Sequence, residues 1–400
     1  MQRTKFEFDN GRGQRLAGRL EEPLDTPRGY ALFAHCFTCS KDIAAATRIS
    51  RALVDRGFGV LRFDFTGLGN SEGDFSNENF GSNVQDLLSA ATAMSAAGKA
   101  PHILIGHSLG GAAVLSAAPD VESALAVVTI AAPSDPGHVT HLLRDDIETI
   151  AREGSAEVCL AGRSFRIEHH FLKALEEHRL EPRLRALGKA LLILHSPTDE
   201  VVEVDQARRI FALARHPKSF VSLDDADHLL SRPRDSQYVA DLLASWASRY
   251  LPPAPEFAPP GEGESVRVTS LPRLAQRVQA RQHVARADEP VRLGGNDSGM
   301  TPYEYLLAAL GTCTAMTLKL YAQRKQWPLD EVRVGLRHER THRSDAEGEG
   351  RVEKLFRTLD IVGNLEAEQR ARLLEIADRC PVHRTLESCP EIVTDLLEPT

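Results

Sequence analysis

The chain has 400 residues, of which 48 are basic and 56 acidic, so its formal net charge at neutral pH is −8. This length predicts two or three domains, and the mildly acidic balance argues against nucleic acid as a partner. The polar N-terminus carries no signal-peptide hydrophobic region, and the most apolar run, residues 124–133, is too short to cross a bilayer. We therefore expect a cytoplasmic chain with no membrane partner, whose six cysteines are reduced.

Short apolar runs in the first 250 residues predict a parallel β-sheet. They lack polar–apolar alternation, as expected for strands buried on both faces. Helical stretches separate them, which predicts the α/β class with a doubly wound, mostly parallel sheet over residues 1–250. The opening residues favour an antiparallel hairpin at one edge, and residues 136–187, too long for a simple connection, are expected to form a lid. The predicted strands are residues 30–35, 59–65, 102–107, 125–132, 190–196 and 219–223.

One serine lies at the end of a predicted strand. The stretch Gly106-His107-Ser108-Leu109-Gly110 follows the run 102–107 and opens an apolar helix. A strand–turn–helix bend exposes such a hydroxyl above the sheet, and small neighbours let the backbone pack closely around it. The helix N-terminus supplies amide donors beside the hydroxyl. The pattern predicts that Ser108 is a nucleophile.

A serine hydroxyl needs a base to remove its proton, and the sequence offers one in the expected order. Asp199 follows the strand 190–196, and His228 follows the strand 219–223, so both belong at the carboxyl edge of the sheet. The predicted roles are attack on an acyl carbon by Ser108, proton transfer by His228 and orientation of the imidazole by Asp199.

Other ionisable residues near these positions offer alternatives. One of the aspartates beside His228 could replace Asp199 as the acid, and these are Asp224, Asp225 and Asp227. The remaining histidines do not form a convincing set of metal ligands, and the pairs considered were His138/His141 and His169/His170. We predict no metal and no cofactor.

Over residues 1–250 the chain resembles the α/β-hydrolase family. Besides the serine motif, residues 62–73, RFDFTGLGNSEG, look like that family's loop after an early strand, and residues 34–40, AHCFTCS, occupy the place of its oxyanion loop. The resemblance implies that the backbone N–H groups of Phe37 and Leu109 form the oxyanion hole. It implies a small-molecule acyl substrate, which is an ester, a thioester or a small amide.

The chain departs from this family at Cys36, because glycine generally follows the histidine there. A side chain forced to positive φ at this position would cost about 1 kcal/mol. Cys36 and Cys39 also form a CxxC pair. We interpret this pair as a coincidence, since nothing else in the sequence supports redox chemistry there.

A proline-rich segment divides the chain. Residues 251–264, LPPAPEFAPPGEGE, contain five prolines and two glycines, a composition typical of a semi-rigid linker. Beyond the segment, strands and helices are segregated, which predicts a smaller α+β domain over residues 265–400. Its predicted strands are residues 265–270, 281–287, 331–342, 355–363 and 391–394, and its predicted helices are residues 302–325 and 366–379.

The first helix of this domain begins with a capping box. Thr301 is the predicted N-cap, Pro302 the first helical residue and Glu304 the third. One face of the helix is predicted to be buried, and it carries Leu306, Leu310, Cys313, Thr317 and Leu320. The residues alone therefore favour Cys313 as a core cysteine.

Residues 265–400 resemble the OsmC/Ohr family of thiol-dependent peroxidases. The resemblance rests on residues 294–313, GGNDSGMTPYEYLLAALGTC, and on Cys380, which precedes a proline 67 residues after Cys313. It implies that Cys313 attacks an organic hydroperoxide and becomes a sulfenic acid. Cys380 then closes a disulfide, which an external thiol reductant opens.

The same resemblance implies support for the Cys313 thiolate. The family supplies an arginine from an early strand, for which Arg281 and Arg277 are candidates, held by a glutamate, for which Glu304 is the candidate. Cys389 is expected to be a bystander.

Two functions remain open on this evidence. The first is a serine hydrolase fused to an organic hydroperoxide reductase. The second is a hydrolase alone, whose C-terminal domain serves as a dimerisation or small-molecule-binding module. In either case the OsmC/Ohr resemblance implies a homodimer formed through the C-terminal domain.

Overall fold

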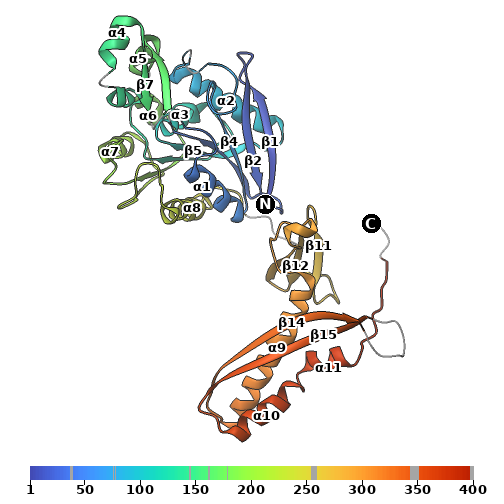
Figure 1. Cartoon of the computed structure of the whole chain (residues 1–400). Helices are drawn as coiled ribbons and strands as arrows, with labels where there is room; N and C mark the ends of the chain where they lie inside the picture. The colour runs from blue at the N-terminus through green and yellow to red at the C-terminus, as the bar shows by residue number, and fades with distance from the viewer. Residues whose placement is uncertain are drawn as a thin grey trace. The chain divides into compact units, whose positions relative to one another are not determined.

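The chain divides into two compact units. The computed structural model describes residues 1–36, 39–74, 76, 78–143, 146–160, 163–177, 179–253, 259–342 and 351–396. The units are Met1–Ala258 and Pro259–Thr400, and their boundary falls inside the proline-rich segment (Figure 1).

An eight-stranded sheet forms the centre of the first unit (Figure 1). Its strand order is β1-β2-β4-β3-β5-β6-β9-β10, with the antiparallel hairpin β1–β2 at one edge. β2 pairs antiparallel with β4, and all later neighbours are parallel. The strands are β1 (Gln2–Asp9), β2 (Arg15–Glu22), β3 (Gly29–Ala34), β4 (Phe58–Phe63), β5 (Pro101–His107), β6 (Ala126–Ile130), β9 (Ala190–His195) and β10 (Lys218–Ser222). The predicted doubly wound, mostly parallel sheet is confirmed.

Helices cover both faces of this sheet. α1 (Ala44–Asp55) and α8 (Pro233–Ala247) share one hydrophobic core with the strands. The opposite core contains α2 (Phe80–Ala96), α3 (Leu109–Ala117) and α7 (Val204–Leu213). Every residue of β4, β6 and β9 is buried. Burial on two faces explains why these strands show no polar–apolar alternation.

The segment predicted as a lid folds into its own small layer. It contains a 3₁₀ helix (Pro136–Leu143), α4 (Ile147–Glu153), the hairpin β7 (Ser155–Leu160)–β8 (Arg163–Glu168), α5 (His169–Glu177) and α6 (Leu180–Arg185). β7 and β8 pair only with each other among the described strands. Ile150, Ile167 and Phe171 join the core that holds α2 and α3. This segment is therefore anchored to the unit through apolar packing.

The second unit has the predicted α+β class. A three-stranded antiparallel sheet contains β11 (Arg267–Ser270), β12 (Gln276–Ala280) and β13 (His283–Ala287), and a long hairpin contains β14 (Leu329–His342) and β15 (Arg351–Gly363). The helices are α9 (Pro302–Lys325), α10 (Ala367–Ala377) and α11 (Pro381–Glu387). Leu318 and Ala322 of α9 pack with Leu373 and Ile376 of α10 in a small core.

One predicted strand of this unit was wrong, and two elements were missed. Residues 391–394 form no strand, and Ile392 and Val393 are 87% and 75% exposed, because no neighbouring strand pairs with them. The prediction also missed β12 and α11. α11 carries a recognisable start, since Cys380 is its N-cap and Pro381 its first residue.

The predicted capping box of α9 is confirmed, but its predicted buried face is not. Thr301 Oγ1 accepts from the Glu304 N–H at 3.3 Å, and Glu304 Oε2 accepts from the Thr301 N–H at 2.7 Å. The residues of α9 that are buried are Leu310, Gly311, Thr314, Leu318 and Ala322. Gly311 lies so close to β14 that a Cβ there would clash with Leu336. Leu310 of the predicted face is buried, but Cys313 and Thr317 are only partly buried and Leu320 is exposed.

α9 is also the one described helix that is long and apolar enough to cross a membrane by length and composition alone. A single such helix is weak evidence for a span, since core helices of other proteins pass the same test.

Candidate active site

Ser108 lies on a sharp bend between β5 and α3. Its φ of 54° and ψ of −125° are strained for a residue with a side chain. The bend is held by the Ser108 N–H, which donates to the Ile130 carbonyl at 2.8 Å. Glycine is required on both sides: a Cβ at Gly106 would clash with Gly110, and a Cβ at Gly110 would clash with the carbonyls of Ala34 and His35.

The structure brings Ser108 together with His228 and Asp199. His228 Nε2 lies 3.0 Å from Ser108 Oγ, and His228 Nδ1 lies 2.8 Å from Asp199 Oδ2. These contacts join three segments that are far apart in sequence at the carboxyl edge of the sheet. With Nδ1–H donating to the carboxylate, Nε2 is left as an acceptor for the serine hydroxyl.

Asp199 is held as a buried carboxylate. Its Oδ1 accepts from the N–H groups of Val201 and Val202, each at 2.9 Å. Burial raises the pKa of Asp199, but the hydrogen bond and charge of His228, together with these two amides, outweigh it and hold the pKa below its usual value. The carboxylate therefore stays charged and keeps the imidazole in one orientation.

The alternative acids beside His228 have other partners. Asp225 forms an ion pair with Arg232 at 2.6 Å, and Asp227 accepts from the Ser231 N–H at 3.0 Å. Asp224 contributes its carbonyl, which accepts from Ser196 Oγ at 2.7 Å. All three are exposed. Asp199 is thus the acid that contacts His228.

The His107 side chain forms a hydrogen bond with the backbone of His228. Its Nε2 lies 2.7 Å from the His228 carbonyl oxygen, so this nitrogen carries the proton and donates. Burial, with the neighbouring His228 charge, lowers the pKa of His107 to about 3. A neutral imidazole therefore fixes the backbone of His228. The sequence placed His107 beside the serine but gave no signal for this contact.

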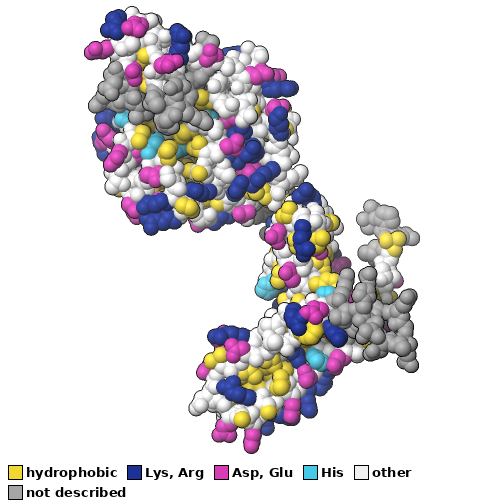
Figure 2. Space-filling view, in the orientation of Figure 1, with side chains coloured by type: hydrophobic (Ala, Val, Ile, Leu, Met, Phe, Trp, Pro, Cys, Tyr) yellow, Lys and Arg dark blue, Asp and Glu magenta, His cyan; other side chains and the backbone are white. Residues whose placement is uncertain are grey.

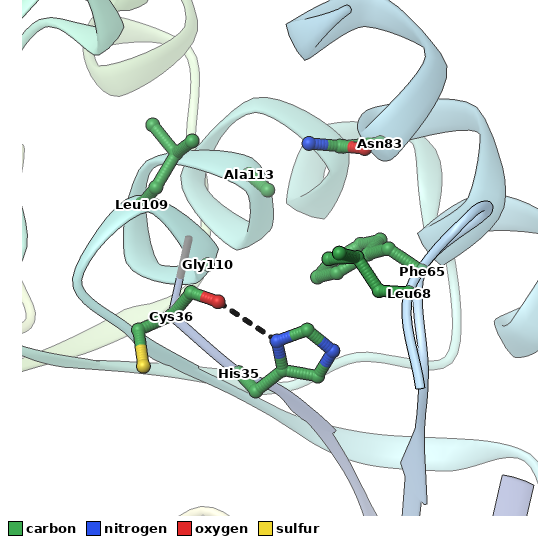
Figure 3. A pocket seen from close by; sticks show the side chains of 8 residues that line it. All are labelled: His35, Cys36, Phe65, Leu68, Asn83, Leu109, Gly110 and Ala113. Atoms are coloured by element: carbon green, nitrogen blue, oxygen red, sulfur yellow. Dashed lines mark hydrogen bonds between the residues drawn. The ribbon is translucent and has the colours of Figure 1, made fainter. Parts of the chain in front are cut away.

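Of the two backbone N–H groups predicted to form the oxyanion hole, the described residues include that of Leu109. Leu109 is the first residue of α3, so its N–H has no intrahelical acceptor. Phe37, the other predicted donor, lies outside the described residues. A small cavity beside Leu109 is lined by the ends of β3 and α3 and by residues of two neighbouring segments: His35, Cys36, Phe65, Leu68, Asn83, Leu109, Gly110 and Ala113 (Figure 3). His35 Nδ1 donates to the Cys36 carbonyl at 2.8 Å across it (Figure 3).

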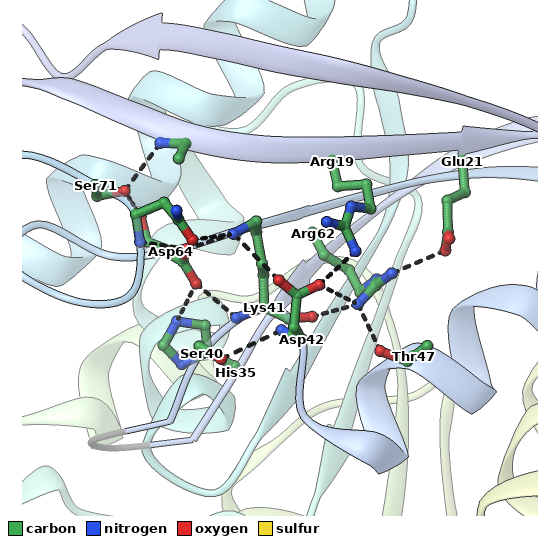
Figure 4. Close-up of polar contacts among 12 residues, drawn as sticks. Arg19, Glu21, His35, Ser40, Lys41, Asp42, Thr47, Arg62, Asp64 and Ser71 are labelled. Carbon is green, nitrogen blue, oxygen red and sulfur yellow. Dashed lines mark hydrogen bonds and ion pairs between the residues drawn. The ribbon is translucent and has the colours of Figure 1, made fainter.

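A buried ionic cluster anchors the chain that follows Cys39 (Figure 4). Lys41 donates to Asp64 twice, from its backbone N–H at 2.6 Å and from Nζ at 2.7 Å. The Lys41 carbonyl accepts from Arg62, which also pairs with Glu21 at 3.0 Å. Because Asp64 and Arg62 belong to β4 and the loop after it, the cluster ties this segment to the sheet.

The state of Cys36 and Cys39 differs from the prediction that they are reduced. They form a disulfide, so the interpretation of the CxxC pair as a coincidence, and the expectation that all cysteines are reduced, were wrong for these two residues. Their Cα atoms lie 5.3 Å apart, within the usual range for a disulfide. Cys36 is also free of the strain expected there, since it does not have a positive φ.

In the second unit, Cys380 lies in a polar network. Its Sγ accepts from the His383 N–H at 3.3 Å and lies 3.7 Å from Thr314 Oγ1. Arg357 donates to Thr314 Oγ1 at 2.9 Å and pairs with Asp378 at 2.6 Å. The sequence analysis missed Arg357 because it lies on β15, far along the chain from either cysteine.

Cys313 lies next to this network. It precedes Thr314 on α9 and is partly exposed rather than a core residue. Glu304 is used in the capping box, and Arg281 lies in the turn between β12 and β13 with a φ of 53°. Arg357, through Thr314, is a cation near Cys380. Within the described ranges, no three His, Cys, Asp or Glu side chains gather as metal ligands.

A nucleophile elbow with its histidine and acid at the carboxyl edge of a doubly wound sheet defines the α/β-hydrolase class. A structure of the esterase domain of a Rhodothermus marinus protein is 51% identical, covers 62% of this chain and 99% of its own, and superposes with a TM-score of 0.53. The first unit therefore belongs to the α/β-hydrolase family.

Sequence comparisons agree with this assignment. Residues 26–138 match the family described as serine aminopeptidase S33, and residues 294–395 match the OsmC-like protein family. The mouse palmitoyl-protein thioesterase ABHD10 is 30% identical over 187 residues, which are 45% of this chain and 62% of the mouse protein. The chain thus spans less than two thirds of that relative. The second unit is OsmC-like, as expected.

The buried neutral His107 makes the stability of the first unit sensitive to acid. In the unfolded chain the histidine has its ordinary pKa of 6.5, whereas in the native protein burial lowers the pKa of His107 to about 3. Between these values the unfolded state binds more protons, so the free energy of unfolding falls as pH falls. At pH 5 the loss from this residue is about 2 kcal/mol relative to pH 8.

Between pH 8 and pH 5, we expect the free energy of unfolding to fall by about 2 kcal/mol less in His107→Gln than in the wild type, because glutamine does not titrate. Urea unfolding at the two pH values measures this difference. His169→Gln, at an exposed position, is the matched control and should keep the wild-type slope. Equal acid sensitivity in His107→Gln and wild type would contradict the assignment.

Proposed function

We propose that the first unit hydrolyses acyl esters or thioesters by nucleophilic catalysis at Ser108. The observation that carries this proposal is the continuous hydrogen-bonded chain Ser108 Oγ–His228 Nε2 at 3.0 Å and His228 Nδ1–Asp199 Oδ2 at 2.8 Å. Such a chain converts an unreactive hydroxyl into a nucleophile.

The steps follow from this geometry. His228 Nε2 takes the proton as Ser108 Oγ attacks the acyl carbon, and Asp199 stabilises the imidazolium. The Leu109 N–H, with the Phe37 N–H as the second donor, holds the developing oxyanion. The protonated His228 then gives its proton to the leaving group. In the second half of the reaction, His228 takes a proton from water as the water attacks the acyl-enzyme, and then returns that proton to Ser108.

Esters and thioesters are the substrate class that the comparisons favour. The 51% identical structure is that of an esterase domain, and the 30% identical mouse protein is named as a palmitoyl-protein thioesterase. Small amides need stronger leaving-group protonation and come second. The segment 136–187 packs on the core beside α3.

The acid of the triad is tested by a matched pair of substitutions. Asp199→Asn removes the negative charge beside His228. The Asn amide can donate to Nδ1, which favours the His228 tautomer whose Nε2 carries the proton and cannot accept the serine proton. We therefore expect kcat to fall by about 10⁴-fold. Asp225→Asn removes an acid that pairs with Arg232, and its kcat should stay within about twofold of wild type. Hydrolysis of a p-nitrophenyl ester and an acyl thioester measures both.

Ser108 is tested by covalent labelling. A fluorophosphonate should label the wild type and spare Ser108→Ala, because phosphonylation needs the activated hydroxyl. Equal loss of kcat in the two aspartate variants, or labelling that persists in Ser108→Ala, would contradict the triad.

We propose that the second unit reduces organic hydroperoxides with the pair Cys313 and Cys380. The Cys313 thiolate attacks the terminal peroxide oxygen, the O–O bond breaks, and the alcohol leaves with a proton. Cys380 attacks the resulting sulfenic acid and releases water as the disulfide forms. An external thiol reductant then restores both thiols.

Arg357 is proposed to support Cys380 in this sequence. Thr314 donates its hydroxyl proton to the Leu310 carbonyl at 2.8 Å and accepts from Arg357, so its remaining lone pair faces Cys380 as an acceptor for the thiol proton. The hydroxyl can also turn toward Sγ, while the Arg357 guanidinium stays bonded to Thr314. This arrangement orients Cys380 and places a positive charge near the sulfur as the disulfide closes.

A dimedone trap tests the chemistry. After treatment with cumene hydroperoxide, Cys380→Ser should carry the adduct on Cys313, because no second thiol resolves the sulfenic acid. Arg357→Met should close the disulfide roughly tenfold more slowly and also accumulate the adduct. Arg333→Met, at an exposed pair with Glu331 on β14, is the control and should behave as wild type. Absence of any adduct and of peroxide-dependent thiol consumption would favour the module without peroxidase activity.

We further propose that the second unit pairs with a second copy. Met316 and Leu320 of α9 are 64% and 56% exposed, and Leu374 of α10 is exposed as well. Hydrophobic side chains gather on the visible surface around α9 (Figure 2). An apolar helix with this much uncovered surface requires a cover, and the same surface on a second chain provides one.

Light scattering on the full chain tests the dimer. We expect wild type to have twice the chain mass, and Met316→Glu/Leu320→Glu to be monomeric, because two buried carboxylates would face each other across the interface. Tyr238→Glu, an exposed aromatic residue of the first unit, is the control and should stay dimeric. A monomeric wild type would overturn this part of the proposal.

A further inference from the structure

We propose that His195 is a positioning residue for the hydrolase, whose imidazole N–H holds the loop that presents Asp199 to His228. This loop, residues 196–202, is called the acid loop below. The inference rests on the proposed hydrolase function and adds a residue to it. It starts from two contacts of His195 Nε2, which lies 2.7 Å from the Val202 carbonyl oxygen and 3.7 Å from Asp199 Oδ2.

The start of the acid loop is fixed to the neighbouring strand. His195 is the last residue of β9, which pairs in parallel with β10. Its carbonyl accepts from the Leu223 N–H at 2.9 Å. One residue later, Ser196 Oγ donates to the Asp224 carbonyl at 2.7 Å. The acid loop therefore begins on the segment that leads from β10 to His228, and its remaining freedom lies further along.

The far end of the acid loop depends on Val202. Its N–H and that of Val201 donate to Asp199 Oδ1, each at 2.9 Å. Asp199 Oδ2 contacts His228 Nδ1 at 2.8 Å. The carbonyl of Val202 accepts from His195 Nε2, and the residue is buried, so water is a poor substitute for this donor. The imidazole of His195 thus fixes the residue whose amide orients the carboxylate.

The chemical state of His195 suits this role. A carbonyl oxygen only accepts, so Nε2 carries the proton and donates. Burial lowers the pKa of His195, against the Val202 hydrogen bond and the Asp199 charge, which raise it, so the ring is neutral. Its Nδ1 is buried with no hydrogen-bond partner among the described residues. An unpaired buried acceptor is unfavourable, and a leucine would avoid it. The donor at Nε2 therefore explains why a histidine stands here.

Kinetics of the full-length protein with a p-nitrophenyl ester test the role of this donor. We expect His195→Leu to lower kcat by about 100-fold with little change in KM, because a displaced carboxylate affects the transition state more than substrate binding. His195→Gln places an amide N–H where Nε2 lies, so its kcat should be within about threefold of the wild type. The rate of fluorophosphonate labelling of Ser108 should follow the same order, and it requires no knowledge of the acyl group.

A double-mutant cycle shows whether His195 acts through Asp199. In Asp199→Asn the carboxylate is already gone, so adding His195→Leu should slow labelling by less than about twofold further. A histidine that only supports the fold would slow labelling by a similar factor in both backgrounds. His102→Leu is the control, because His102 Nδ1 also bonds to a backbone group, the Tyr30 N–H at 3.3 Å, but lies at the amino end of β5. This variant should keep the wild-type kcat.

Circular dichroism checks that each variant is folded. Where leucine prevents folding, His195→Asn takes its place in the comparison with His195→Gln. The asparagine side chain is one methylene shorter than that of glutamine, so its amide does not reach the Val202 carbonyl. We expect His195→Asn to show the same loss of kcat as His195→Leu.

The outcomes distinguish the inference from the function on which it rests. An unchanged kcat in His195→Leu, no recovery in His195→Gln, or equal losses in both backgrounds of the cycle would each overturn the inference and leave the triad intact. No labelling of Ser108, or a kcat that Asp199→Asn does not lower, would overturn the proposed hydrolase function itself, and the inference with it.

Discussion

The close approach of β3 to the N-terminus of α3 is the constraint on which the first unit depends. Gly106 and Gly110 have no Cβ, so the carbonyls at the end of β3 can lie against the first turn of the helix. This contact forces Ser108 into a strained bend and places its hydroxyl above the sheet. It also sets the strand end that leads to Cys36 beside Leu109. The nucleophile and the oxyanion side are therefore positioned by one packing contact.

His228 shows how little freedom remains once that bend is made. Its ring contacts Ser108 on one nitrogen and Asp199 on the other, while its backbone carbonyl accepts from His107. All three partners are buried. Asp199 also accepts from the N–H groups of Val201 and Val202, which hold its carboxylate in place. The backbone of His228 is therefore held by a buried, neutral His107. Because burial lowers the pKa of His107, this arrangement lowers the free energy of unfolding in acid and not at neutral pH.

The sequence predicted the elements whose signal is local and missed those that depend on distant partners. Apolar runs identified the parallel strands, and order along the chain identified Ser108, Asp199 and His228, because strand ends in such a sheet meet at one edge. Order along the chain could not identify Arg357, because it lies on β15 and contacts Thr314 of α9 only through tertiary packing. The buried face of α9 was predicted only in part, because Leu310 is buried but the close contact with β14 is made at Gly311, and Leu320 of the predicted face is exposed. An apolar spacing alone does not indicate where a glycine lets a helix approach a strand.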